Sequence, residues 1–198
     1  LAWAQRTNVV LSLAASKDSA NAKQREAAQN LVRRWFADAS TTQQELEKYI
    51  GVLQRGFKTI SGRLNRGKFL LVDWVPLRKA SSQDERRRRN SAAFVLPETR
   101  DSLDVIYIGN GFFGANSDVL QGQKYWTRVI LHEFSHLVCK TDDIGCGDTI
   151  RYATVGIGPH AGFPARETIK NADNWAMFSA DCAMVLTENE RRHALRQV

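Results

Sequence analysis

Two histidines and a glutamate stand close together in the run His132-Glu133-Phe134-Ser135-His136. On an α-helix, residues four positions apart share a face, so both imidazoles could bind one metal ion with Glu133 beside them. Catalytic Zn²⁺ sites need two such imidazoles, a third protein ligand, an open position for water and a carboxylate that takes the proton from that water. The spacing therefore predicts one Zn²⁺ ion on His132 and His136, with Glu133 as the general base of a hydrolase.

Apolar residues around this motif predict that it lies on a helix. They are Trp126, Ile130, Phe134 and Leu137, whose spacings of four, four and three are typical of a helix face packed on a core. An alternative is that the two histidines form a surface pair beside an acid and bind no metal. Unpartnered histidines between apolar residues would carry a desolvation cost, which favours the metal site.

Several downstream residues could supply the third ligand: Asp142, Asp143, Asp148, His160, Glu167 and Asp173. The position six residues after His136 is Asp142, so the longer signature with a third histidine is not met. Glu167 would correspond to the solution in which a glutamate on a later helix binds the zinc. A carboxylate of the acidic loop 141–147 is more attractive, because a group a few residues past the helix end can fold back onto the metal.

Patterns before the motif predict helices and then strands. Residues 19–38 have a strong helical pattern, and a helix within residues 2–15 is weakly indicated. Thr42 and Glu45 have the spacing of a capping box that opens another helix. Short apolar runs at 69–75, 92–97 and 104–108 predict three strands.

After the motif, a Gly- and Pro-containing stretch to residue 164 leads to a predicted helix from Arg166 to about Leu186, followed by a polar tail with a solvated His193. Helices segregated around a small mixed or antiparallel sheet make an α+β fold the simplest assembly. At 198 residues the chain is long enough for one substantial core, so we expect a single domain over residues 1–198.

The composition argues against several classes of protein. The net charge of +7 favours anionic surfaces, but much of it lies in the charged run 84–90, which is typical of a solvated loop. Aromatic residues do not alternate with these charges, so we expect no nucleic-acid partner. Apolar runs are too short for a membrane span. Cys139, Cys146 and Cys182 allow one disulfide and one free thiol, with Cys139 and Cys146 closest in sequence.

Three ordered segments resemble the deuterolysin (aspzincin) metalloendopeptidases, which include the peptidyl-Lys metalloendopeptidases. The family pattern is H-E-x-x-H, a G-T-x-D-x-x-Y-G loop and an N-A-D helix, and here it corresponds to 132–136, 141–147 and 171–178. Weaker similarity extends the match to roughly residues 28–185. The resemblance implies a zincin-like fold and a zinc-dependent endopeptidase that acts on protein or peptide substrates.

The resemblance also implies roles for individual residues. It places Zn²⁺ on His132, His136 and Asp143, with Glu133 as general base. Asp173 matches a functionally important family aspartate, which implies a group that supports a ligand or meets the substrate. Tyr107 falls where the family has a tyrosine on the strand near the site, and the alternative is a half-buried strand tyrosine.

Three positions depart from the family pattern. Lys140 stands where the family has Gly, and Cys146 replaces the loop Tyr that is credited with holding substrate or the oxyanion. Ala176 lies one turn after Asp173, where the Lys-directed members have an acid, so lysine specificity is not implied. The Cys146 replacement permits an alternative function, a catalytically impaired peptidase-like binding domain.

The chain begins at Leu1 without an initiating Met and without the pattern of a signal peptide, which suggests a processed protein or an excised domain. We expect a secreted protein, the toxin or effector module of a larger bacterial protein, delivered into another cell or the periplasm. We further expect a monomer, with an immunity or inhibitor protein as a partner.

Overall fold

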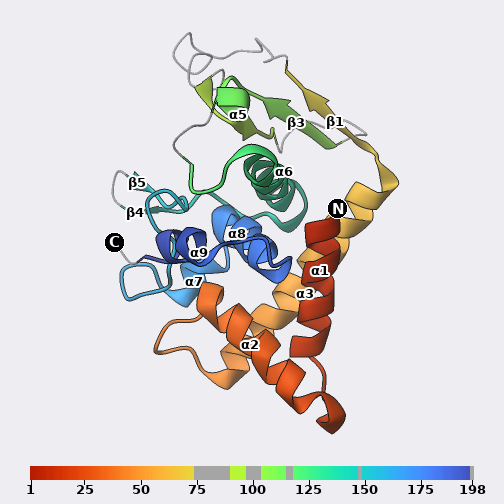
Figure 1. The fold of residues 1–198 in the computed structure, drawn as a ribbon, viewed down its shortest axis with the longest axis vertical. Helices are drawn as coiled ribbons and strands as arrows, with labels where there is room; N and C mark the ends of the chain where they lie inside the picture. The colour runs from red at the N-terminus through yellow and green to blue at the C-terminus, as the bar shows by residue number, and fades with distance from the viewer. Residues whose placement is uncertain (74–89, 97–103, 115–117, 147–148, 197–198) are drawn as a thin grey trace.

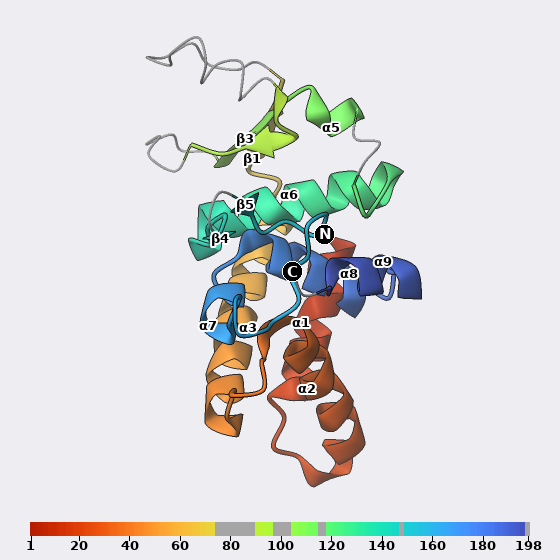
Figure 2. The same cartoon turned by 90° about the vertical axis from the view of Figure 1, so that its left-hand side faces the viewer.

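A computed structural model describes residues 1–73, 90–96, 104–114, 118–146 and 149–196. The fold is α+β, as predicted. Figures 1 and 2 show a small sheet at one end, helix α6 beneath it, α8 beneath α6, and the N-terminal helices at the opposite end. The predicted solvated loop at 84–90 lies outside the described residues except for Asn90.

The N-terminal layer is helical, as the sequence predicts. It contains α1 (Ala2–Ala14), a 3₁₀ turn (Ser19–Asn21), α2 (Ala22–Phe36) and α3 (Gln43–Arg66). The Thr42 hydroxyl accepts from the Glu45 amide and the Glu45 side chain returns to Thr42, which confirms the predicted capping box. Gly67 caps the C-terminal end of helix α3, and its φ of 62° is a conformation that favours glycine.

The sheet is mixed. Strands β1 (Phe69–Val72), β2 (Ala93–Phe94) and β3 (Asp104–Ile108) lie in the order β1-β3-β2, with β1 parallel and β2 antiparallel to β3. All three predicted strands are found, although residues 74–75 and 97 of the predicted runs lie outside the described residues. A short helix, α5 (Gly111–Gly114), follows β3.

Helix α6 (Gly122–Cys139) carries the histidines and packs between the sheet and α8 (Ala172–Cys182), as Figure 2 shows. The Phe134 ring lies 5.1 Å from the Phe69 ring, centroid to centroid, and is fully buried. The predicted apolar stripe is wrong at Trp126, which is 42% exposed and stacks on Phe112 instead. Because α6 is covered on two sides, its buried surface is wider than one stripe and includes polar residues.

The chain after α6 contains elements that the sequence did not predict. Strand β4 (Gly145–Cys146) lies in the expected acidic loop and pairs with β5 (Thr149–Ile150) in the Gly- and Pro-containing stretch. Helix α9 (Glu188–Ala194) lies within the expected polar tail. The single helix predicted from Arg166 to Leu186 is wrong: α7 (Ala165–Thr168) and α8 are separate. The break comes at Asn171, whose side-chain amide donates to the Arg151 carbonyl and the Asn174 side chain.

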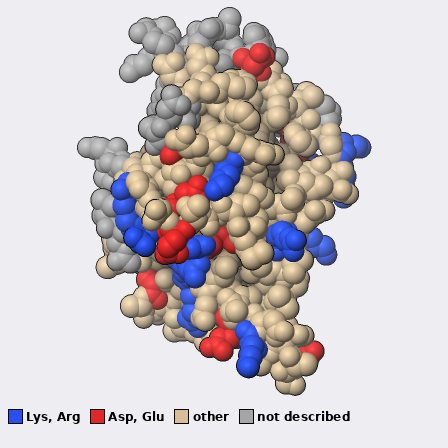
Figure 3. Space-filling model, viewed as in Figure 1, with Lys and Arg blue, Asp and Glu red and all other residues tan. Residues whose placement is uncertain are grey.

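The cysteines and the surface charges follow simple patterns. Cys139 and Cys182 are both free thiols, so the suggested Cys139–Cys146 disulfide is not formed. On the face drawn in Figure 3, basic and acidic side chains alternate on the left-hand side, and the remaining basic side chains are scattered and form no single patch. Among the described residues, no helix is both long and apolar enough to cross a membrane.

Helices α2, α8 and α9 meet at one buried carboxylate, Asp181, which is 3% exposed. It accepts hydrogen bonds at 2.9 Å from the Arg34 guanidinium, the Trp35 indole and the Arg191 guanidinium. Asp181→Ala leaves these donors unpaired, so we expect the free energy of unfolding to fall by about 3 kcal/mol.

Urea denaturation measures this loss. The matched control is Glu188→Ala, which removes an ion pair to the same Arg191 from a side chain that is 70% exposed and should cost less than about 0.5 kcal/mol. Equal losses in the two variants would contradict a structural role for Asp181.

Candidate metal centre

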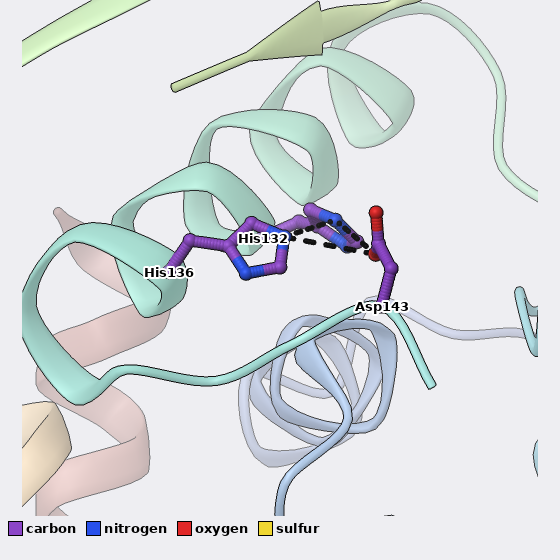
Figure 4. Close-up of side chains that lie close together, drawn as sticks. All are labelled: His132, His136 and Asp143. Atoms are coloured by element: carbon purple, nitrogen blue, oxygen red, sulfur yellow. Dashed lines mark hydrogen bonds and ion pairs between the residues drawn. The ribbon is translucent and has the colours of Figure 1, made fainter. Parts of the chain in front are cut away.

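Two elements bring the metal-binding candidates together. His132 and His136 project from one face of α6, and Asp143 comes from the segment that follows the helix and passes back beneath it, as Figure 4 shows. Lys140 ends the helix in the left-handed conformation, with φ at 56°, which reverses the chain. The Asp142 amide then donates to the Lys170 carbonyl at 2.8 Å, which fixes the returning segment against the start of α8.

The three side chains converge on a small volume. The Nε2 atoms of His132 and His136 are 3.0 Å apart, and Asp143 Oδ1 lies 3.1 Å and 3.6 Å from them, respectively. All three potential ligand atoms lie within 4.8 Å of one another. The sequence-based set His132, His136 and Asp143 is therefore brought together by the fold.

The hydrogen bonds at the opposite ring nitrogens determine the tautomers. His136 Nδ1 lies 2.7 Å from the Thr141 carbonyl oxygen, which can only accept, so Nδ1 carries the proton. His132 Nδ1 lies 3.1 Å from Asp173 Oδ1 and donates to it in the same way. In the neutral rings, both Nε2 lone pairs therefore face each other and Asp143.

Asp143 supplies a third acceptor. Burial opposes ionisation of its carboxyl, but when the histidines of the metal-free protein are protonated, their contacts outweigh this and hold the pKa of Asp143 far below its usual range. Its Oδ1 atom is buried and accepts no hydrogen bond from any described residue. Three acceptors that face one another repel unless a cation lies between them, and two imidazoles with one carboxylate suit Zn²⁺ with a position left for water. The residues present therefore fit the predicted metal.

Glu133 lies beside this cluster. It is 5% exposed, and burial raises the pKa of its carboxyl. Two cavities meet at Glu133 and Asp143: one runs past Arg128 and Tyr152, and the other past His136 and Lys140. A carboxylate with a raised pKa at this junction can exchange protons with groups in both cavities.

Asp173 lies behind the cluster on α8 and is fully buried. Besides His132, it binds the Arg128 guanidinium, and it accepts from the Ala153 amide at 2.6 Å. Burial opposes its ionisation, but the positive charge of Arg128 and the bond to His132 lower the pKa of Asp173 to about 2. The carboxylate thus orients His132 and lies outside the cavity walls.

The structure places a different tyrosine at the cluster from the one that the sequence suggested. Tyr107 lies on β3 with its ring stacked on Phe94 at 5.0 Å and lines neither cavity. Tyr152, which follows β5, lines the first cavity and donates from its hydroxyl to Asp143 Oδ2 at 3.0 Å. Burial and the Asp143 charge raise the pKa of Tyr152, so it stays a donor. The only sequence signal was a tyrosine shortly after the metal loop.

The other candidates lie away from the cluster or outside the described residues. His160 Nδ1 contacts the Gly158 carbonyl, and Glu167 lies within 4 Å of Arg166 and Lys170. Asp142 is exposed and its side chain accepts from the Asp143 amide, while Asp148 is not described. The alternative of a surface histidine pair is wrong for His132, which is only 6% exposed.

Comparison with known proteins agrees with this geometry. A family model described as the lysine-specific metallo-endopeptidases, the aspzincin family, matches residues 21–180 of the 198-residue chain. The chain belongs to this family. No curated protein and no solved structure gave a significant match. The resemblance of the motifs is thereby confirmed, and membership in this family supports a zinc metallopeptidase.

The Lys140 position gives a stability prediction for this aspzincin chain. A residue with a Cβ is strained at φ 56°, and family members have Gly at this position, so we expect Lys140→Gly to raise the free energy of unfolding by about 0.5–1 kcal/mol. The converse control is Gly67→Ala at φ 62°, where an added Cβ meets nothing within 4 Å and should cost about 1 kcal/mol. Thermal unfolding of both variants tests this, and a destabilised Lys140→Gly would contradict it.

Proposed function

We propose that this chain is a zinc-dependent endopeptidase that hydrolyses peptide bonds in protein substrates, with Glu133 as general base. The observation that carries the proposal is the convergence of three acceptor atoms beside a buried carboxylate. The Nε2 atoms of the two histidines and Asp143 Oδ1 face one another, and Glu133 stands at the junction of two cavities. Each cavity can hold one side of a peptide bond.

His132, His136 and Asp143 would hold the metal. When bound, Zn²⁺ supplies a water of lowered pKa and polarises the scissile carbonyl. Glu133 would take a proton from the attacking water and later deliver it to the leaving amine, a transfer that its raised pKa favours. Asp173 keeps His132 Nδ1 protonated and the ring fixed, and the Thr141 carbonyl does the same for His136.

Tyr152 supports the catalytic function against the alternative of an impaired binding domain. Cys146 replaces the loop tyrosine of the family, but the Tyr152 hydroxyl lies at the metal cluster and lines the cavity with Glu133. A phenol that remains protonated can turn its one hydrogen bond from Asp143 Oδ2 to an oxyanion that forms at the scissile carbonyl. The chain therefore keeps a donor at the site although the family position is lost.

Proteolysis of an unfolded protein tests this function. We expect the zinc-loaded chain to cut denatured casein at several positions, a chelator to abolish the cleavage, and added Zn²⁺ to restore it. Tight substrate binding without any chelator-sensitive product would instead support the peptidase-like binding domain.

A further inference from the structure

An arginine lies in the wall of the cavity beside the metal cluster. This cavity has a volume of about 290 Å³ and includes His132, Glu133 and Asp143 in its lining. Arg128 lies on α6 one turn before His132, so its side chain stands on the same helix face as the metal-binding histidines. The residue is only 7% exposed, which means that its charge must be balanced by nearby acids.

Two aspartates supply that balance. Arg128 donates from one terminal nitrogen to Asp118 Oδ2 at 2.6 Å and from the other to Asp173 Oδ1. The remaining oxygens are also engaged: Asp118 Oδ1 accepts from the Leu120 amide and Asp173 Oδ2 accepts from the Ala153 amide. Both carboxylates are therefore satisfied within the protein.

A lysine side chain in this cavity would need a carboxylate partner, because burying an unpaired ammonium group is costly. Among the described residues that line the cavity, the carboxylates are Asp118, Glu133 and Asp143. Glu133 and Asp143 belong to the metal site, and Asp118 already binds Arg128. Both terminal nitrogens of the guanidinium contact carboxylates, whereas Arg128 Nε is buried without a hydrogen-bond partner among the described residues. Because two negative charges face one positive charge here, the guanidinium offers little attraction to an acidic side chain.

We propose that Arg128 is a specificity-determining residue that occupies the position of a substrate cation and excludes lysine and arginine side chains from this cavity. The cavity then accepts uncharged side chains, for which the small wall residues Ser91, Ala92 and Ala93 leave room. This inference rests on the proposed peptidase function. The cleavage specificity that it predicts differs from the lysine specificity named in the description of the chain's family.

Cleavage-site profiling tests the proposal directly. The zinc-loaded chain is incubated with a proteome-derived peptide library, and the residues on both sides of each cut are counted. We expect lysine and arginine to be depleted on the side of the bond that enters the cavity, with uncharged residues enriched there. A profile in which lysine and arginine are depleted on neither side of the cut would overturn the proposal while supporting the peptidase function.

A second measurement needs no catalysis. Arg128→Ala should leave a space between Asp118 and Asp173 that fits a cation, and n-butylammonium should bind there. n-Butylammonium chloride should therefore raise the melting temperature of this variant by at least about 2 °C more than that of the parent. Tetramethylammonium chloride at the same concentration controls for ionic strength, because it cannot donate hydrogen bonds. Arg151→Ala is the matched variant: Arg151 is also 7% exposed, but its guanidinium stacks over Phe163.

The outcomes distinguish a failure of the proposed peptidase function from a failure of the proposed role of Arg128. No cleavage of any peptide would contradict the proposed function, and the ammonium comparison would still decide the role of Arg128. An equal response of Arg128→Ala, Arg151→Ala and the parent to n-butylammonium would overturn that role. If Arg128→Ala does not fold, Arg128→Lys, which keeps a cation between the aspartates, should retain the parental cleavage profile. A gain of lysine cleavage in Arg128→Lys would contradict the proposal.

Discussion

Glu133→Gln is expected to lower kcat for peptide hydrolysis roughly a thousandfold while zinc remains bound. The amide has the shape of the carboxylate but cannot take a proton from water, and loss of a positioned general base costs about 10²- to 10⁴-fold. Glu133 is not one of the three converging ligand atoms, so the metal should stay. Initial rates on a quenched fluorescent peptide, with zinc content measured on the same preparation, give both quantities.

The fold should tolerate this change. Burial raises the pKa of Glu133, which means that the charged carboxylate pays a desolvation cost that the neutral amide avoids. We therefore expect the melting temperature of Glu133→Gln to equal or exceed that of the parent. Activity within a few fold of the parent would remove Glu133 from the mechanism.

Asp143→Ala is expected to lose zinc during purification. Asp143 supplies the only carboxylate oxygen among the three described ligand candidates, and its Oδ1 is the atom that lacks a hydrogen-bond partner among the described residues. Without it, two imidazoles remain, too few protein ligands for a catalytic zinc site. Metal analysis of the purified variant should show zinc well below one equivalent.

Two neighbouring aspartates provide controls for that result. Asp142→Ala removes an exposed side chain next in sequence and should keep stoichiometric zinc. Asp173→Asn leaves an oxygen that can accept from His132 Nδ1, so it should bind zinc about 10- to 100-fold more weakly than the parent. Full zinc in Asp143→Ala together with none in Asp173→Asn would reverse the assignment of the third ligand.

The parts of the site that depend on local sequence could be predicted from it. The i, i+4 spacing of His132 and His136 fixes their common face once the helix forms, and apolar neighbours ensure that it does. The structure explains why the family pattern has glycine at the position of Lys140. The backbone adopts the left-handed conformation there, which glycine favours.

Other features depend on the tertiary fold. Arg128 looks like a surface residue in the sequence, and only the approach of Asp118 and Asp173 from other segments makes it a buried one. Tyr152 reaches the cluster because the β4–β5 hairpin folds the chain back, and those strands are too short to leave a pattern. Helix α9 did have a readable signal, the Thr187–Glu190 capping box, which the polar composition of the tail obscured.

The most direct test of the metal centre is anomalous diffraction from a crystal of the zinc-loaded chain at the zinc absorption edge. We predict one peak at about 2.0–2.2 Å from His132 Nε2, His136 Nε2 and an oxygen of Asp143, with Glu133 outside the coordination sphere. A peak bound to Asp173 in place of Asp143, or no peak between the two histidines in a zinc-loaded crystal, would contradict this account.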